Sequence, residues 1–204
     1  MAHAAPIDED MMTPPRGYEE GAGVYNEKLG MWVFLGSEVM FFTALIGAYI
    51  ILRVAHPVSW KPPGEVLNVS LTAVNTFLLI CSSVTMVKAF AAIQDGNLAG
   101  LKRWLIATVL IGAAFVGVQV YEYMHLIDKG FVPSEGLYGS TFYTMTGFHG
   151  FHVAMGVICL MFVTWKAFQG KYTAADHRGV EVVGLYWHFV DLVWIILFTI
   201  VYLI

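Results

Sequence analysis

Residues 29–52, LGMWVFLGSEVMFFTALIGAYIIL, form one apolar stretch that contains a single charged residue, Glu38. A helix rises about 1.5 Å per residue, so this stretch is long enough to cross a hydrocarbon core of roughly 30 Å. Backbone groups in lipid must be hydrogen-bonded within their own segment, which favours a helix over an isolated strand. The stretch is therefore predicted to be a transmembrane helix.

Four further apolar stretches follow, and the gaps between them are rich in Pro, Gly, Asn and Asp. They predict transmembrane helices near residues 68–90, 104–124, 141–168 and 180–203. Hydrophobic residues make up 58% of the chain and charged residues 13%, about half the roughly 25% that a water-soluble domain carries. The sequence therefore predicts an all-α fold, a polytopic membrane bundle of five transmembrane helices over residues 29–204.

The remaining composition narrows the class of protein. The net charge is −4 and no basic run is present, which argues against nucleic-acid binding. Cys81 and Cys159 both lie in apolar stretches, so neither a disulfide framework nor a cysteine metal site is expected. Residues 1–28 form a polar, acidic N-terminal tail, and no signal or transit peptide is predicted there.

Lys and Arg residues are distributed unevenly between the two ends of the predicted helices. Those on the side of the tail and of the second and fourth loops are Arg16, Lys28, Lys88, Lys102, Arg103, Lys166, Lys171 and Arg178. The opposite side has only Arg53, Lys61 and Lys129. The positive-inside rule then places the N-terminus inside and the C-terminus outside, which agrees with five crossings.

Ionisable residues inside a bilayer are costly, so each is a functional candidate. Glu38 lies about 15 Å along its helix from Lys28, close to the membrane midplane. It would relay protons, anchor a neighbouring subunit or lipid, or form a neutral carboxyl that is hydrogen-bonded to another helix.

A second polar set lies on the later helices and consists of Asn75, Glu122, His149, His152, His188 and Asp191. Small and polar side chains at helical spacing allow hydrogen bonds between membrane helices, so a polar clamp between residues 141–168 and 180–203 is expected. Two facing histidines would also suit a haem b. Glu122 and His125 spell a di-iron motif, but Glu122 lies near the outer surface, roughly 10 Å from the histidines. Hydrogen bonding between helices is the favoured interpretation, and spacing alone indicates an accessory subunit or a small transporter.

In order and spacing, these landmarks resemble subunit III of the haem–copper terminal oxidases, the cytochrome c oxidase subunit 3 family. The motifs that carry the resemblance are SEVMFF (37–42), VNT (74–76) with Ser82 and Ser83, YEY (121–123), GSTF (139–142), TGFHGFHV (146–153) and YWHFVDLVW (186–194). The resemblance extends from about Gly30 to Ile204.

The resemblance implies a supporting subunit without a catalytic or metal site, in a complex whose haems and copper lie in partner subunits. The expected partners are subunit I in direct contact, subunit II, a small subunit IV and phospholipids, in a bacterial plasma membrane. Glu38 would face subunit I or lipid and support proton uptake during aerobic electron transport. Asn75, Glu122, His149, His152, His188 and Asp191 would form the inter-helix polar set.

Many members of this family have seven helices, and this chain begins at what would be their third. The family's lipid cleft lies between the first two helices and the other five, so one wall of that cleft is absent here. Three alternatives stay open from the sequence: a cytochrome c oxidase subunit, which the motif spellings favour, an accessory subunit of a quinol oxidase or nitric oxide reductase, and a free-standing haem b protein.

Overall fold

The computed structural model describes residues 24–60, 64, 67–134 and 136–204, and its elements are five long helices with two short ones. The long helices are α1 (Asn26–Ala55), α3 (Val69–Gln94), α4 (Leu98–Asp128), α5 (Leu137–Phe168) and α6 (Arg178–Phe198). The short ones are the 3₁₀-helix η2 (Pro57–Ser59) and the π-helix η3 (Thr199–Leu203), which extends α6. All five long helices are apolar and long enough to span a membrane, which confirms the predicted five-helix fold.

The helices are longer than the apolar stretches that predicted them. The stretch at residues 104–124 belongs to a helix that begins at Leu98 and ends at Asp128. Apolar sequence marks only the part of a helix that lies in hydrocarbon, whereas backbone hydrogen bonding continues until a cap interrupts it. Two such caps are Asn68 and Asn97, whose side chains accept hydrogen bonds from the amides of Leu71 and Gly100.

Two predictions, for the N-terminal tail and for the membrane side of each terminus, concern the ends of the chain. Most of the predicted tail, residues 1–23, lies outside the described residues, and residues 26–28 belong to the first turn of α1. Which membrane side each terminus faces stays a prediction.

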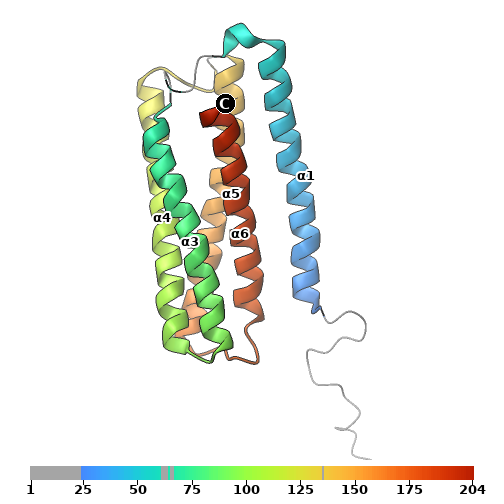
Figure 1. The fold of residues 1–204 in the computed structure, drawn as a ribbon, viewed down its shortest axis with the longest axis vertical. Coiled ribbons are helices and arrows are strands. Elements are labelled where there is room, and N and C mark those ends of the chain that lie inside the picture. Colours follow the sequence, from blue (N-terminus) through green and yellow to red (C-terminus); the bar gives the residue numbers. More distant parts are fainter. Residues whose placement is uncertain (1–23, 61–63, 65–66, 135) are drawn as a thin grey trace, which may run out of the picture.

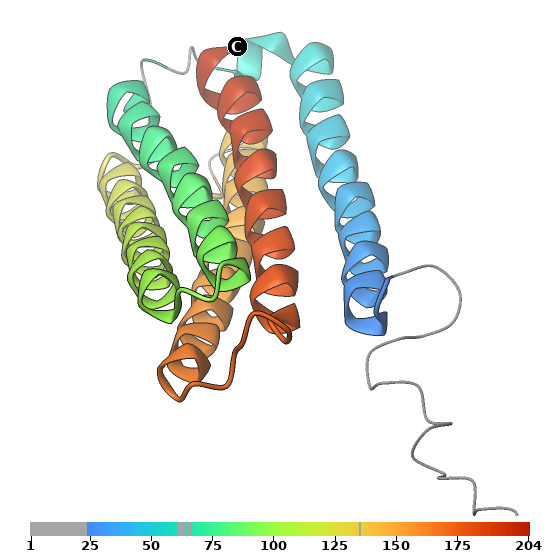
Figure 2. The same ribbon diagram turned by 60° about the horizontal axis from the view of Figure 1, so that its bottom comes forward.

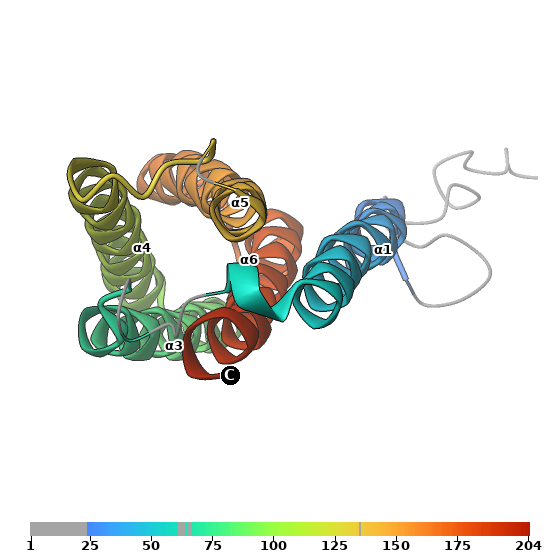
Figure 3. The ribbon, with the colours of Figure 1, turned by 90° about the horizontal axis from the view of Figure 1, so that it is seen from above.

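Helices α3, α4, α5 and α6 form a four-helix bundle, and α1 stands outside it (Figure 1). The view from above shows the four helices as a closed ring with α1 beside α6 (Figure 3), and the tilted view shows the same order (Figure 2). Helix α1 contacts α6 and α5. Only Phe42 and Tyr49 of α1 are buried, so most of this apolar helix is left uncovered by the chain's described part.

The centre of the bundle is organised around two tryptophans of α6. Trp187 packs between Gly112 of α4 and Gly156 of α5, where any side chain would meet the indole ring. Its Nε1 donates a hydrogen bond to Ser82 Oγ of α3 at 2.9 Å, and Trp194 Nε1 donates to Thr76 Oγ1 at the same distance. Each indole therefore buries a large apolar surface and satisfies its one donor on α3.

Candidate functional site

Glu38 and His152 meet at the contact between α1 and α5. The carboxylate Oε2 of Glu38 lies 3.1 Å from His152 Nε2, and both side chains are more than four-fifths buried. His152 Nδ1 lies 2.7 Å from the carbonyl oxygen of Phe148, which can only accept, so Nδ1 carries a hydrogen. Nε2 is then hydrogen-bonded to the carboxyl group, either as the acceptor from a neutral carboxyl or as the donor to a carboxylate.

A cavity of about 380 Å³ lies beside this pair, between α1, α5 and α6. Its lining is Met31, Phe34, Glu38, Phe151, His152, Met155, Cys159, Val183 and Tyr186. The hydroxyl of Tyr186 donates to the carbonyl oxygen of His152 at 2.9 Å and so keeps this wall of the cavity in place. The acid–imidazole pair is thus the polar end of a mainly apolar cavity.

Helix α1 is fixed to the bundle at both of its ends as well. At the first end, Glu181 of α6 accepts from Lys28 Nζ at 2.6 Å and from Tyr25 at 2.7 Å. Burial and the hydrogen bond to Glu181 raise the pKa of Tyr25 above its usual range. At the other end, Arg53 donates to the backbone oxygens of Ile200 and Ile204. Together with the Glu38–His152 contact, three polar links position a helix that contributes few buried side chains.

His149 is completely buried on the other side of α5. Its Nε2 lies 3.1 Å from the carbonyl oxygen of Val190 in α6, and its ring stacks on Trp194 with centroids 4.7 Å apart. The carbonyl accepts, so Nε2 donates. A metal at Nε2 would have to displace this hydrogen bond, whereas the buried Nδ1 has no hydrogen-bond partner among the described residues.

His188 and Asp191 form a separate contact with α3. His188 Nδ1 is hydrogen-bonded to Ser83 Oγ at 2.9 Å, and Asp191 lies beside the same hydroxyl. The sequence predicted a clamp between these two residues and the histidines of residues 141–168. The structure instead places the partner of His188 on α3, while the histidines of α5 bond to Val190 and Glu38.

Glu122 and Asn75 join α3 to its neighbours nearer the other end of the bundle. Glu122 Oε1 is 2.9 Å from Thr72 Oγ1 and 3.3 Å from the hydroxyl of Tyr202. Asn75 Nδ2 donates to the carbonyl oxygen of Phe115 at 3.3 Å. Glu122 therefore bonds to α3 and to the C-terminal turn, which suits a linking role better than a place in a metal cluster.

The sequence analysis missed a polar group between α4 and α5. Gln119 Nε2 donates to the carbonyl oxygen of Thr146 at 3.0 Å, and the hydroxyls of Tyr123 and Thr146 lie 2.6 Å apart. The one sequence signal was an uncharged polar residue, Gln119, in an otherwise apolar stretch.

His, Cys, Asp and Glu, the residue types that bind metal ions in proteins, occur on several of these helices. In the ranges that the structure describes, no three His, Cys, Asp or Glu residues come together in a way that could hold a metal ion.

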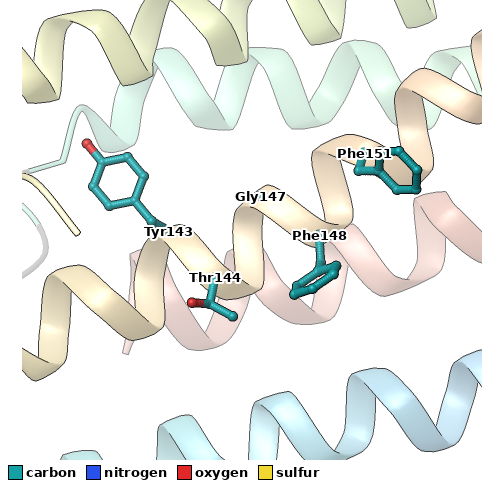
Figure 4. Close-up of a pocket in the computed structure, with 5 residues that line it drawn as sticks. All are labelled: Tyr143, Thr144, Gly147, Phe148 and Phe151. Carbon is teal, nitrogen blue, oxygen red and sulfur yellow. The ribbon is translucent and has the colours of Figure 1, made fainter. Parts of the chain in front are cut away.

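A second cavity, of about 450 Å³, lies on the outer face of α5 and is lined by Tyr143, Thr144, Gly147, Phe148 and Phe151. Figure 4 shows that all five residues come from this one helix. Its lining contains no ionisable group except the Tyr143 hydroxyl, which donates to the carbonyl oxygen of Phe131.

Five spanning helices with polar side chains between them define a multi-pass membrane protein. The sequence model of the family "Cytochrome c oxidase subunit III" matches residues 16–204. The chain belongs to this family, and so it is a subunit III of a haem–copper oxidase.

Similar proteins named cytochrome c oxidase subunit 3 occur in several bacteria. The protein of Thermostichus vulcanus is 40% identical over 176 residues, which cover 86% of both chains. The protein of Synechocystis sp. is 44% identical over 85% of this chain and 74% of its own length. A probable subunit 3 from Mycobacterium tuberculosis is 42% identical over 86% of this chain and 87% of its own.

Proposed function

We propose that this chain is a supporting, non-redox subunit of a proton-pumping cytochrome c oxidase in a bacterial plasma membrane. In this proposal the haems and copper belong to partner subunits, and the chain packs directly on subunit I beside subunit II and a small subunit IV. The names of the relatives support cytochrome c as the electron donor rather than a quinol.

The observation that carries the proposal is the Glu38–His152 pair. Its carboxylate oxygen and ring nitrogen lie 3.1 Å apart near the middle of α1, in a mainly apolar setting. A carboxyl and an imidazole at this distance exchange a proton without large movement, since hydrogen-bond contact is the geometry that proton transfer requires. The pair would sustain proton uptake by the neighbouring subunit over many turnovers and leave oxygen reduction itself to that subunit.

The exposed side of α1 supports packing on subunit I. Val33, Met40, Ile51 and Val54 are each about 70% exposed or more. Lipid tails are as apolar as these side chains, so the hydrophobic effect alone does not hold two helices together in a membrane. The contact with subunit I would therefore depend on close packing of this side of α1. The cavity beside Glu38 would hold phospholipid that organises this contact. Asn75, Glu122, His149, His188 and Asp191 would keep the four-helix bundle rigid behind it.

The test uses the purified complex with Glu38→Gln and Glu38→Ala, and Glu122→Gln as a matched buried carboxyl away from α1. We expect normal haem and copper content and a normal initial rate of oxygen consumption. We also expect a several-fold shorter active lifetime during turnover for the Glu38 variants alone. An unchanged lifetime, or immediate loss of all activity in a fully assembled complex, would contradict the supporting role.

The electron donor is tested separately on the wild-type complex. Oxygen consumption with reduced cytochrome c but not with a quinol is the expected result. The opposite preference would make the chain a quinol oxidase subunit and would leave the Glu38 experiment valid.

A further inference from the structure

A groove lies between α4 and α5. Helix α4 stands on the opposite side of the bundle from α1 (Figure 3). It has a volume of about 270 Å³ and is lined by Ile106, Val109, Leu110, Met161, Thr164, Trp165 and Phe168. The one aliphatic hydroxyl in this lining, that of Thr164, donates a hydrogen bond to the carbonyl oxygen of Leu160. Apart from the indole N–H of Trp165, the surface of the groove is therefore apolar.

Two basic side chains stand at the end of this groove. Lys102 and Arg103 lie four and three residues before Ile106, so they share its face of α4 one turn closer to the α3–α4 loop. Lys102 Nζ lies 5.2 Å from the centroid of the Phe168 ring. The lysine side chain therefore extends from α4 to α5 across the end of the groove. Arg103 is exposed. Lysines near the end of a membrane helix commonly pack their methylene groups on apolar or aromatic side chains and place the amine among the lipid headgroups.

We propose that the α4/α5 groove binds one acyl chain of an anionic phospholipid whose phosphate contacts Lys102 and Arg103. The lipid belongs to the leaflet on the side of the α3–α4 and α5–α6 loops. This inference is independent of the role proposed for Glu38, and the groove is separate from the cavity next to α1.

Charge complementarity selects this groove over the other apolar hollows and selects a lipid over a partner helix. The cavity on the outer face of α5 is larger, but its lining includes no basic residue (Figure 4). The cavity beside α1 contains the acid Glu38. A further cavity near the α5–α6 loop does include Lys166 and Arg178, but the acids Glu27 and Asp176 line it as well. An anionic phospholipid matches both features with one molecule: its acyl chain fits the apolar groove, and basic residues at this level attract its negative head.

The first experiment measures lipid affinity in the purified, delipidated complex by native mass spectrometry. Phosphatidylglycerol is titrated into the wild type, into the Lys102→Gln/Arg103→Gln variant, and into a Lys88→Gln/Lys171→Gln control that loses the same charge elsewhere at this end. Losing both phosphate contacts should lower the affinity of the first variant roughly thirty-fold, about 1 kcal/mol per contact. The control should lose much less, because its two lysines are not at the groove. Equal loss in both variants, or equal affinity of the wild type for zwitterionic phosphatidylcholine, would overturn the proposal.

The second experiment fills the groove without changing charge. Thr164→Phe should displace the lipid, whereas Thr144→Phe, in the uncharged cavity of the same helix, should leave it bound. The two threonines are matched, because each donates its hydroxyl to the carbonyl four residues earlier. A photo-crosslinker at position 110 should label lipid in the native complex, and a crosslink to a partner protein at that position would refute lipid as the occupant.

Discussion

Replacing Gly112 by alanine tests how tightly the tryptophan at the centre of the bundle is held. A Cβ at this position would lie 2.6 Å from Trp187 Cη2 and 2.9 Å from Cζ2. Ordinary contact begins at 3.4 Å, so the indole would have to move by about 0.8 Å (3.4 − 2.6). It has no free direction, because Gly156 lies against it from α5 and Ser82 holds its Nε1.

The expected cost follows from two opposing effects. Overpacking a dense interior costs about 1–3 kcal/mol, and alanine in place of glycine inside a helix recovers about 1 kcal/mol. Gly112→Ala should therefore lower the free energy of unfolding by up to about 2 kcal/mol. Gly117→Ala is the matched control on the same helix. Nothing lies within 4 Å of its added Cβ, so it should leave stability unchanged or raise it by up to about 1 kcal/mol.

The assay is unfolding of the chain in mixed detergent micelles by increasing sodium dodecyl sulfate, followed by far-UV circular dichroism. The informative quantity is the difference in free energy of unfolding between the two alanine variants. The gain in helix propensity is the same in both and cancels, so the difference should be about 1–3 kcal/mol, the overpacking cost. Equal stability of the two variants would show that Gly112 does not confine Trp187, and the described packing of this indole ring would be refuted.

Three further changes probe other contacts of the structure. Trp194→Phe removes the buried donor to Thr76 and should cost about 1–2 kcal/mol in the same assay, whereas Trp165→Phe, at an exposed position, should cost much less. The pKa of Tyr25 is raised by burial, so the folded state keeps this proton when the unfolded state loses it. Stability should therefore fall as the pH rises above about 10, and Tyr25→Phe should flatten that alkaline decline in thermal unfolding. Arg53→Gln should speed hydrogen exchange in the last turn of the chain, because its backbone oxygens lose a charged donor; unchanged exchange would contradict this capping contact.

The sequence alone determined the number, type and approximate position of the helices. This is because the requirement that lipid imposes is local: each apolar stretch must satisfy its own backbone, whatever its neighbours are. The cost of burying polar groups in lipid also marked Glu38, His149 and His188 as candidates for contacts between helices, and their functional roles stay predictions. The ends of the helices were less well predicted, since caps such as Asn97 lie beyond the apolar stretch.

Only the tertiary structure decided which polar groups meet. The helical period showed that His149 and His152 lie close on one helix, but not that one faces Val190 of α6 and the other faces Glu38 of α1. Similarly, His188 bonds to Ser83 of α3, a helix that the predicted clamp did not include. Partner choice depends on the order of the helices around the bundle and on how each is rotated about its axis. The order and the rotation of the helices are set by side-chain packing between distant segments, such as that of Trp187 between two glycines. No local pattern in the sequence specifies this packing.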